Sequence, residues 1–391
     1  MFISRFKEIS IVTTLAVLVI ASASAEDGVS KDKIVFGQAA ALEGPAAALG
    51  QGMRTGLEAA FAEANKAGGV SSRKLELKSV NDGYEPKNSI EAVRKLLADE
   101  KVFAIAGAVG TPTAAAIAPI AIRAGVPFIG AFTGAEFLRE PYSPLVVNIR
   151  ASYFQETEAM VEHLTKDLGV SKIAIMYQDD AFGKAGLAGV KKALAKRQLQ
   201  LAAEGTFVRN TTAVKTALLA LRNSQPDAVV MIAPYKPAAE FIKLAKQIKF
   251  NPVFVNISFV GSDAFADELG SDGAGVVVTQ VVPFPSDVTI PLVARYHSAI
   301  KDGNFNARPG FISLEGYVVG RAIISLLGKV DGELTRQAFV EVVRKSGAID
   351  LGGLKLVYGD SNNRGSEEVF LTMIQSDGTF KALDRLAKPR T

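Results

Sequence analysis

The stretch IAGAVGTPTAAAIAP, Ile105–Pro119, joins the end of a predicted strand to the start of a predicted helix. An apolar run stops at Gly107, and small residues with two hydroxyls follow before a run of alanine and isoleucine. Pro112 suits a first helical turn, because proline has no N–H to leave unpaired there. In an open parallel sheet, ligands lie beyond the carboxyl ends of the strands. The stretch therefore predicts a strand end, a helix start and a binding edge in one place.

Strand-like and helix-like segments alternate on both sides of this stretch. The pattern predicts strands at 34–39, 75–80, 102–106 and 126–129, and helices at 50–64, 86–97 and 112–123. Such β-α-β order indicates a parallel sheet that is covered by helices on both faces.

The same alternation starts again near residue 150, which predicts a second α/β lobe. It places strands at 172–177, 199–205, 228–233, 253–257 and 276–280, and helices at 155–168, 182–197, 212–223 and 237–248. Longer helices follow at 290–301, 311–327 and 335–345, and two short β-like pieces at 354–358 and 369–374. Because no low-complexity linker separates the two halves, we expect two doubly wound parallel-sheet lobes joined by a hinge.

The first 25 residues are typical of a cleaved secretory signal peptide. Arg5 and Lys7 precede an apolar run from Ile9 to Ile20, and the sequence Ala-Ser-Ala at 23–25 suits signal peptidase. An uncleaved anchor is the alternative, although the apolar run is short for a membrane span. The chain has no cysteine, so neither a disulfide nor a lipid-bearing thiol is available. We expect a free protein in the periplasm of a bacterium with two membranes.

Other classes of function find little support in the sequence. The formal net charge is only +4, and no basic patch is interleaved with aromatic residues, so nucleic acid is not an expected partner. His163 and His297 lie far apart, and no cluster has the spacing of a metal site. Phosphate-loop and nucleophile-elbow patterns are not found. We therefore predict no cofactor, no metal and no enzymatic activity.

A second strand end resembles the first. FIGAFTGAEF, Phe128–Phe137, places Thr133 between small residues at the equivalent edge of the sheet. Hydroxyls and amide N–H groups at a helix start favour an anion, and the small residues let a ligand approach the backbone. We expect a carboxylate to bind near Thr111 and Thr133. The alternative is an ordinary threonine helix cap followed by alanines that pack the helix on the sheet.

Several stretches, in this order and spacing, carry a family resemblance through nearly the whole chain after the signal peptide. They are LEGPAAALGQGMRTGLEAAFAEANKAGGV (42–70), VNDGYEPKNSIEAVRKLL (80–97), the stretch quoted first, AGVPFIGAF (124–132), KIAIMYQDDAFGKAG (172–186) and PDAVVMIAPYKPAAEFIKLAK (226–246). The sequence resembles the periplasmic solute-binding proteins of branched-chain amino-acid ABC transporters, the Leu/Ile/Val-binding type with the type I periplasmic-binding fold.

The resemblance implies two α/β lobes joined by three crossovers, near Arg150, Val281 and Val357. Residues 26–150 plus 282–356 would form the first lobe, and residues 151–281 plus 357–391 the second. It also implies that the lobes close on a small carboxylate solute, a branched-chain or related amino acid. The closed protein would then deliver the solute to an ABC permease in the inner membrane.

The resemblance also implies a set of ligand contacts. The matched positions are Thr111, Phe132 and Gly134 for the ligand carboxylate, with Thr133 beside them; Phe182 and Tyr235 for aromatic contacts from the second lobe; and Leu49 for the side-chain pocket.

One position departs from the pattern of the family. Its amino-acid binders place an acidic residue after the strand around Phe254, where it pairs with the ligand's ammonium, but this chain has Ser258 and Phe259 there. We expect these two residues to contact the ligand in its place. A buried ammonium without a counter-charge is costly. Either Asp82, Asp179 or Asp180 substitutes, or the ligand is an aromatic or other acid without an α-ammonium. A ligand sensor for a regulatory system is a further alternative.

Overall fold

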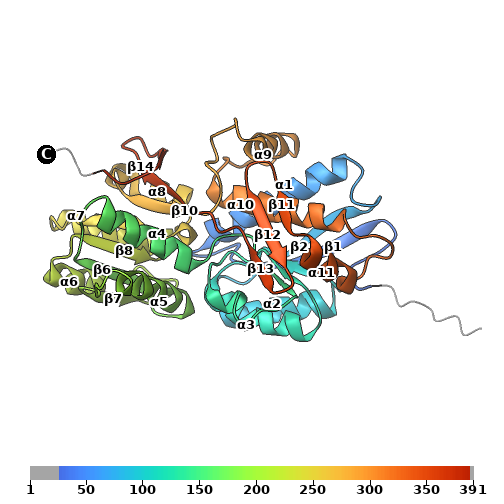
Figure 1. Ribbon diagram of the computed structural model, residues 1–391, viewed down its shortest axis with the longest axis horizontal. Helices are drawn as coiled ribbons and strands as arrows, with labels where there is room; N and C mark the ends of the chain where they lie inside the picture. The colour runs from blue at the N-terminus through green and yellow to red at the C-terminus, as the bar shows by residue number, and fades with distance from the viewer. Residues whose placement is uncertain (1–25, 388–391) are drawn as a thin grey trace, which may run out of the picture.

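The computed structural model describes residues 26–387, so the predicted signal peptide lies outside the described residues. Two lobes lie side by side along the long axis of the molecule, each built on its own sheet (Figure 1). The first sheet is parallel and has the order β2-β1-β3-β4-β5. Its strands are β1 (Lys33–Ala40), β2 (Lys74–Asn81), β3 (Ala104–Ala106), β4 (Phe128–Ile129) and β5 (Val146–Val147).

Helices cover both faces of the first sheet. Buried side chains of α2 and α3 pack on one face, and those of α1 and α10 pack on the other. The helices of this lobe are α1 (Ala47–Lys66), α2 (Pro86–Ala98), α3 (Thr111–Arg123), α9 (Pro291–Asp302), α10 (Phe311–Leu327) and α11 (Arg336–Lys345).

The second sheet has the order β15-β14-β10-β9-β8-β6-β7. The strands β6 to β10 are parallel, whereas β14 and β15 form an antiparallel hairpin that joins β10 at one edge. The strands are β6 (Ile173–Gln178), β7 (Glu204–Phe207), β8 (Ala228–Ile232), β9 (Val253–Asn256), β10 (Val277–Gln280), β14 (Phe370–Ile374) and β15 (Phe380–Leu383). The helices are α4 (Tyr153–Lys166), α5 (Ala181–Ala195), α6 (Lys215–Ser224), α7 (Tyr235–Gln247) and α8 (Ser262–Leu269).

A small antiparallel sheet stands beside the first lobe. It consists of β11 (Ala348–Asp350), β12 (Lys355–Gly359) and β13 (Asn362–Gly365). The backbone N–H of Asn148 donates to the carbonyl of Asn363 at 3.0 Å, which ties this sheet to the end of β5. The expected crossover at Val357 falls inside β12, and the chain enters the second sheet only with β14.

The predicted fold class is confirmed, and three connections join the lobes: β5 to α4, β10 to α9, and β13 to β14. Local signals explain several boundaries. Ser152 and Gln155 form a capping box at the start of α4, and the Asp180 side chain caps α5 through the N–H of Phe182. The strand expected at 199–205 begins later, at Glu204, because its register follows Ile175 of β6.

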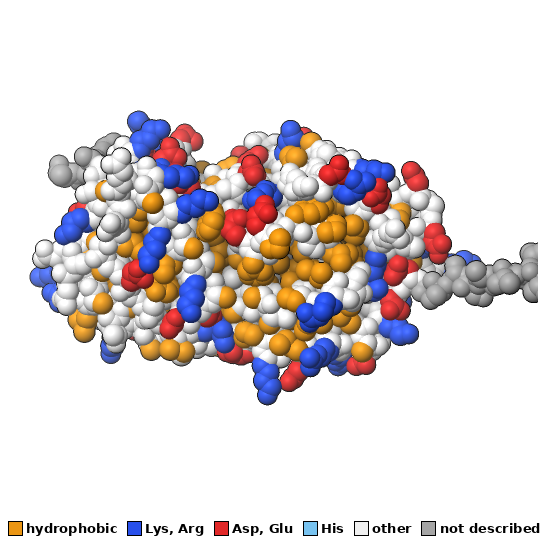
Figure 2. All heavy atoms as spheres, turned by 60° about the horizontal axis from the view of Figure 1, so that its bottom comes forward, with side chains coloured by type: hydrophobic (Ala, Val, Ile, Leu, Met, Phe, Trp, Pro, Cys, Tyr) orange, Lys and Arg blue, Asp and Glu red, His pale blue; other side chains and the backbone are white. Residues whose placement is uncertain are grey.

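Figure 2 shows charged side chains of both signs scattered over one face of the molecule, with hydrophobic side chains gathered on the first lobe. None of the described helices is long and apolar enough to cross a membrane.

Candidate functional site

All nine residues predicted to contact a ligand are buried, and they lie where the two lobes meet. The first lobe contributes four of them from the loops after β3 and β4, and a fifth from α1. The other four come from α5, α7 and the 3₁₀ turn at Ser258–Val260. The nine are Leu49, Thr111, Phe132, Thr133, Gly134, Phe182, Tyr235, Ser258 and Phe259.

The two strand ends singled out by the sequence lie against each other. The Oγ1 atoms of Thr111 and Thr133 are 2.7 Å apart and fully buried. Backbone bonds link the same loops, since Phe132 N donates to the carbonyl of Ala108 and Gly110 N to that of Phe132. Gly110 has φ 105°, and a Cβ there would collide with the Tyr84 ring. Glycine thus allows the sharp entry that places Thr111 at the first turn of α3.

Tyr153 completes this group, although the sequence analysis did not identify it. It opens α4, and its buried hydroxyl has no hydrogen-bond partner. The hydroxyls of Thr111 and Thr133 lie nearby, and burial raises the pKa of Tyr153. Gly134 makes the approach possible, because a Cβ there would lie 2.6 Å from Tyr153 N. Three hydroxyls from both sides of the junction thus converge, and one of them is unpaired.

Aromatic rings fill the centre of the junction. Phe259 lies at its middle, with ring centroids 4.6 Å from Phe182, 5.1 Å from Phe132 and 5.9 Å from Tyr84. Tyr153 packs on Phe182 at 5.6 Å. The predicted aromatic positions of the two lobes therefore meet in one cluster, which gives the site flat apolar walls.

Leu49 and Tyr235 lie together beside Gly261, which follows the Ser258–Val260 turn. A Cβ on Gly261 would lie 2.6 Å from Leu49 Cδ2 and 3.6 Å from Tyr235 Cδ1. The N–H of Ala48 donates to the Tyr235 hydroxyl across the junction at 3.5 Å. These two predicted residues thus form a second part of the junction, next to the aromatic cluster.

Ser258 contacts a buried network of charged groups. Glu156 of α4 accepts hydrogen bonds from the backbone N–H and Oγ of Ser258, both at 2.9 Å, and from Thr279 Oγ1 at 2.6 Å. Arg150 donates to Glu156 at 3.2 Å and also to Ser258 Oγ. Its other terminal nitrogen lies 3.5 Å from Glu315 of α10. Burial raises the pKa of Glu315 to about 7, despite the attraction of Arg150.

The three aspartates that were candidate partners for an ammonium have different surroundings. Asp82 is buried and accepts hydrogen bonds from Tyr84 N and Ser89 Oγ, both at 2.8 Å. Burial raises the pKa of Asp82 to about 6. Asp180 caps α5, and Asp179 is exposed.

The sequence signals for the missed residues are weak. Glu315 is the exception, because it is a single acid within the apolar run of Phe311–Leu327. Arg150, Tyr153 and Glu156 follow one another across a crossover, and nothing in their spacing indicates that they face the ends of β3 and β4.

A polar rim closes the junction on the side of α2. Arg209 forms ion pairs with Glu85 of the first lobe at 2.8 Å and with Asp180 at 3.0 Å. Asn210 donates to Glu85 at 2.7 Å, and Gln178 donates to the Tyr84 hydroxyl at 3.2 Å. The two lobes are therefore in direct contact along this rim.

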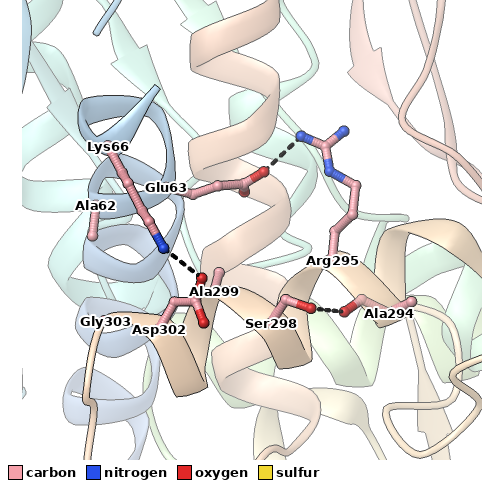
Figure 3. Close-up of a pocket in the computed structure, with 9 residues that line it drawn as sticks. All are labelled: Ala62, Glu63, Lys66, Ala294, Arg295, Ser298, Ala299, Asp302 and Gly303. Carbon is pink, nitrogen blue, oxygen red and sulfur yellow. Dashed lines mark hydrogen bonds and ion pairs between the residues drawn. The ribbon is translucent and has the colours of Figure 1, made fainter. Parts of the chain in front are cut away.

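A surface cavity of about 470 Å³ lies away from the junction, between α1 and α9. Figure 3 shows its alanine floor and the two ion pairs across it, Lys66 with Asp302 at 2.8 Å and Glu63 with Arg295 at 2.7 Å. These pairs join the two helices of one lobe. Within residues 26–387, no group of three or more His, Asp or Glu side chains is placed to hold a metal ion.

Comparisons with known proteins agree with this architecture. The family model described as periplasmic binding protein matches residues 33–379. Among solved structures, a possible leucine/isoleucine/valine-binding protein from Rhodopirellula baltica SH 1 is 37% identical, with a TM-score of 0.86 over 92% of this chain and 98% of that one. A fatty acid ABC transporter substrate-binding protein from Thermomonospora curvata shares the fold, with a TM-score of 0.83 at 19% identity over 93% of this chain and 94% of that one.

Curated relatives lead to the same family. The Leu/Ile/Val-binding protein homolog 7 of Brucella suis biovar 1 (strain 1330) is 24% identical over 371 residues, which cover 88% of this chain and 90% of the relative. The resemblance drawn from the sequence is thereby confirmed, and the fold, the matched range and these relatives agree: the chain belongs to the periplasmic binding protein family, of the Leu/Ile/Val-binding type.

Proposed function

We propose that the protein is the periplasmic solute-binding component of an ABC importer, and that it holds a small carboxylate between its two lobes. The main support is the group of three buried hydroxyls, Thr111, Thr133 and Tyr153, which both sides of the junction supply. Hydroxyls donate well to a carboxylate, and a hydrogen bond to a charged group contributes about 1.5–3 kcal/mol.

The aromatic cluster supports a solute with an apolar body. Phe132, Phe182 and Phe259 pack against one another at the junction, and Leu49 with Tyr235 adds further apolar surface beside them. Branched-chain amino acids and small aromatic acids both combine one carboxylate with such a body. One relative is named for Leu/Ile/Val and one protein of the same fold for fatty acids, so the scaffold accepts apolar bodies of different shapes.

The lobe arrangement supports a transport role. Three connections link lobes that can separate, and the rim contacts from Glu85 to Arg209 and Asn210 form only when they meet. Closure would bury the solute, and a permease in the inner membrane would recognise the closed form. The expected lobe boundaries near residues 150 and 281, with a third between β13 and β14 in place of residue 357, and the periplasmic location after signal cleavage, belong to this proposal.

The test is a ligand screen with the purified chain from Glu26 onward. Branched-chain amino acids, small aromatic acids and short fatty acids at about 1 mM are compared by thermal shift, and hits are measured by calorimetry. A ligand with a micromolar dissociation constant should stabilise the folded state by about 4 kcal/mol under these conditions. If no carboxylate in the panel shifts the unfolding temperature, the proposal is wrong.

A further inference from the structure

The charged groups next to the hydroxyls indicate which carboxylates the site takes, provided that the function proposed above holds. An α-ammonium is attached one carbon away from its carboxylate. It would therefore lie beside whatever borders Thr111, Thr133 and Tyr153. Arg150 lies close to this group, since its guanidinium is 5.8 Å from the centroid of the Tyr153 ring and 5.0 Å from that of Phe132, the residue before Thr133. An ammonium held there would face a buried positive charge.

The nearby carboxyl groups already have hydrogen-bond or ion-pair partners within the protein. Glu156 receives four hydrogen bonds, from Arg150, from Thr279 and from the N–H and hydroxyl of Ser258. Glu315 faces the other terminal nitrogen of the same arginine. Asp82 and Asp180 have the partners described above. Thus one internal cation already satisfies the two acids at the hinge.

The buried donors that lack acceptors also favour a ligand without an α-ammonium. Arg150 is about 1% exposed, yet its Nε atom has no partner and its Nη1 atom has only the ion pair with Glu315 at 3.5 Å; the Tyr153 hydroxyl has no hydrogen-bond partner either. Buried donors without acceptors are costly, and native sites supply acceptors for them. An ammonium brings only further donors, whereas a carboxylate with a neighbouring oxo or hydroxyl oxygen brings acceptors.

We propose that Arg150 acts as a built-in cation in place of a ligand ammonium, so that the site selects carboxylic acids that lack an α-ammonium group. Acids with an oxygen next to the carboxylate, the 2-oxo and 2-hydroxy acids, fit best. Arg150 is then a residue that determines specificity, and the Ser258 position follows from it, because an acid there would add a third carboxylate to one arginine.

The experiment compares ligands that differ only at the α-carbon. Leucine is paired with 4-methyl-2-oxopentanoate and 2-hydroxy-4-methylpentanoate, and phenylalanine with phenylpyruvate and phenyllactate, all by calorimetry at pH 7.5. In at least one of the two series the oxygen-bearing acid should bind at least about tenfold more tightly than the amino acid, equivalent to about 1.4 kcal/mol. Amino acids that bind as tightly or more tightly would overturn the inference and leave the carboxylate site intact. Failure of every carboxylate to bind would overturn the proposed function together with the inference.

Variants of Arg150 test its role directly. Arg150→Met should lower the preference for the oxygen-bearing acid over the amino acid by about tenfold or more. Glu156 loses its positive partner in this variant, so its carboxylate would favour a ligand ammonium. Arg150→Lys keeps the charge and should keep most of the preference, which separates charge from packing. Circular dichroism and the unfolding temperature check that each variant folds. An unchanged preference in a folded Arg150→Met protein would contradict the assignment, and the ligand comparison on the unmodified protein stands even if neither variant folds.

Discussion

The rim and the interior of the lobe junction differ in how their polar groups are paired. At the rim, the Glu85 carboxylate has partners for both oxygens, Arg209 and Asn210. In the interior, the Tyr153 hydroxyl and Arg150 Nε are buried without partners, and Arg150 Nη1 has only the ion pair with Glu315 at 3.5 Å. The rim also leaves two buried atoms without a hydrogen-bond partner, Arg209 Nε and Gln178 Oε1, but each of these side chains makes a contact between the lobes through another atom. Tyr153 differs, because its only side-chain polar atom is unpaired, and this supports our proposal that a ligand binds in the interior rather than at the rim.

The largest expected effect is a change in folding stability with pH, which arises from the buried charge of Glu315. Because burial raises the pKa of Glu315 from 4.5 to about 7, folding favours its protonated form. The stability that this preference contributes is fully present below about pH 4.5 and is lost as pH rises through about 7. At 1.36 kcal/mol per pKa unit, the loss is about 3 kcal/mol. Glu315→Gln cannot ionise, so it should gain stability relative to the unmodified protein over this interval. Urea unfolding from pH 4.5 to 8 measures the difference.

Glu367→Gln, at an exposed position, is the control for this experiment. Its unfolding free energy should follow that of the unmodified protein at every pH. If the unfolding free energy of Glu315→Gln also follows that of the unmodified protein at every pH, the interior charges are better solvated than their burial indicates.

Removing the paired hydroxyls should have the next largest effect. Thr111→Val together with Thr133→Val should weaken binding of a carboxylate about a hundredfold, because each hydrogen bond to a charge contributes about 1.5–3 kcal/mol. Calorimetry with the best ligand of the screen measures the loss. Thr165→Val, on a part-buried helix position in the second lobe, is the matched control and should leave affinity unchanged. Equal affinity for the double variant would refute the carboxylate edge.

Two tyrosines sharpen the comparison between paired and unpaired hydroxyls. Tyr153→Phe should lower affinity about tenfold without loss of stability, because its hydroxyl has no partner in the protein. Tyr296→Phe should lower stability and leave ligand affinity unchanged, because the Tyr296 hydroxyl contacts Ser313 Oγ at 2.6 Å and accepts from Gly310 N at 2.9 Å. Its cost in stability should be about 1 kcal/mol. Thermal unfolding and calorimetry on both variants check the crossed pattern, and a stability loss at Tyr153 would contradict it.

The rim should give the smallest effect. Glu85→Ala removes both contacts to Arg209 and Asn210, and partly exposed ion pairs contribute about 0–1 kcal/mol. Affinity should fall no more than about fivefold, mainly through faster ligand dissociation in stopped-flow measurements. Asp302→Ala is the control. It breaks an exposed ion pair with Lys66 within the first lobe and should change neither the ligand affinity nor the rate of ligand dissociation. If Glu85→Ala lowered ligand affinity as much as the double variant at Thr111 and Thr133, the distinction between rim and interior would be wrong.

The helices of the fold could largely be predicted, because their signals are local. The run Phe311–Leu327 is apolar along most of its length and is helical over that whole range. Short strands such as β5 and β13 could not be predicted, because two to four residues carry no period, and their pairing depends on a neighbour. The helix α8 was missed for a similar reason, since its eight residues carry only a short apolar pattern.

The site could be predicted in part. Thr111 and Thr133 were found because parallel strand ends meet at one edge, which is a rule of topology. Arg150, Glu156 and Glu315 were not found, because their meeting depends on how a crossover, a helix of the second lobe and a helix of the first are packed. The missing acid at Ser258 was visible in the sequence, but the arginine that occupies its surroundings was visible only in three dimensions.

The hairpin β14–β15 has a consequence for how the chain is made. It completes the edge of the second sheet by pairing with β10, although nearly a hundred residues of the first lobe's helices and of the small sheet lie between them. A ribosome therefore releases β6 to β10 well before their last partner strands exist. During that interval β10 presents an unpaired edge, which is open to pairing with other chains. The second lobe can complete its sheet only once the C-terminal hairpin is present, and truncation before Phe370 should yield aggregation rather than a smaller soluble protein.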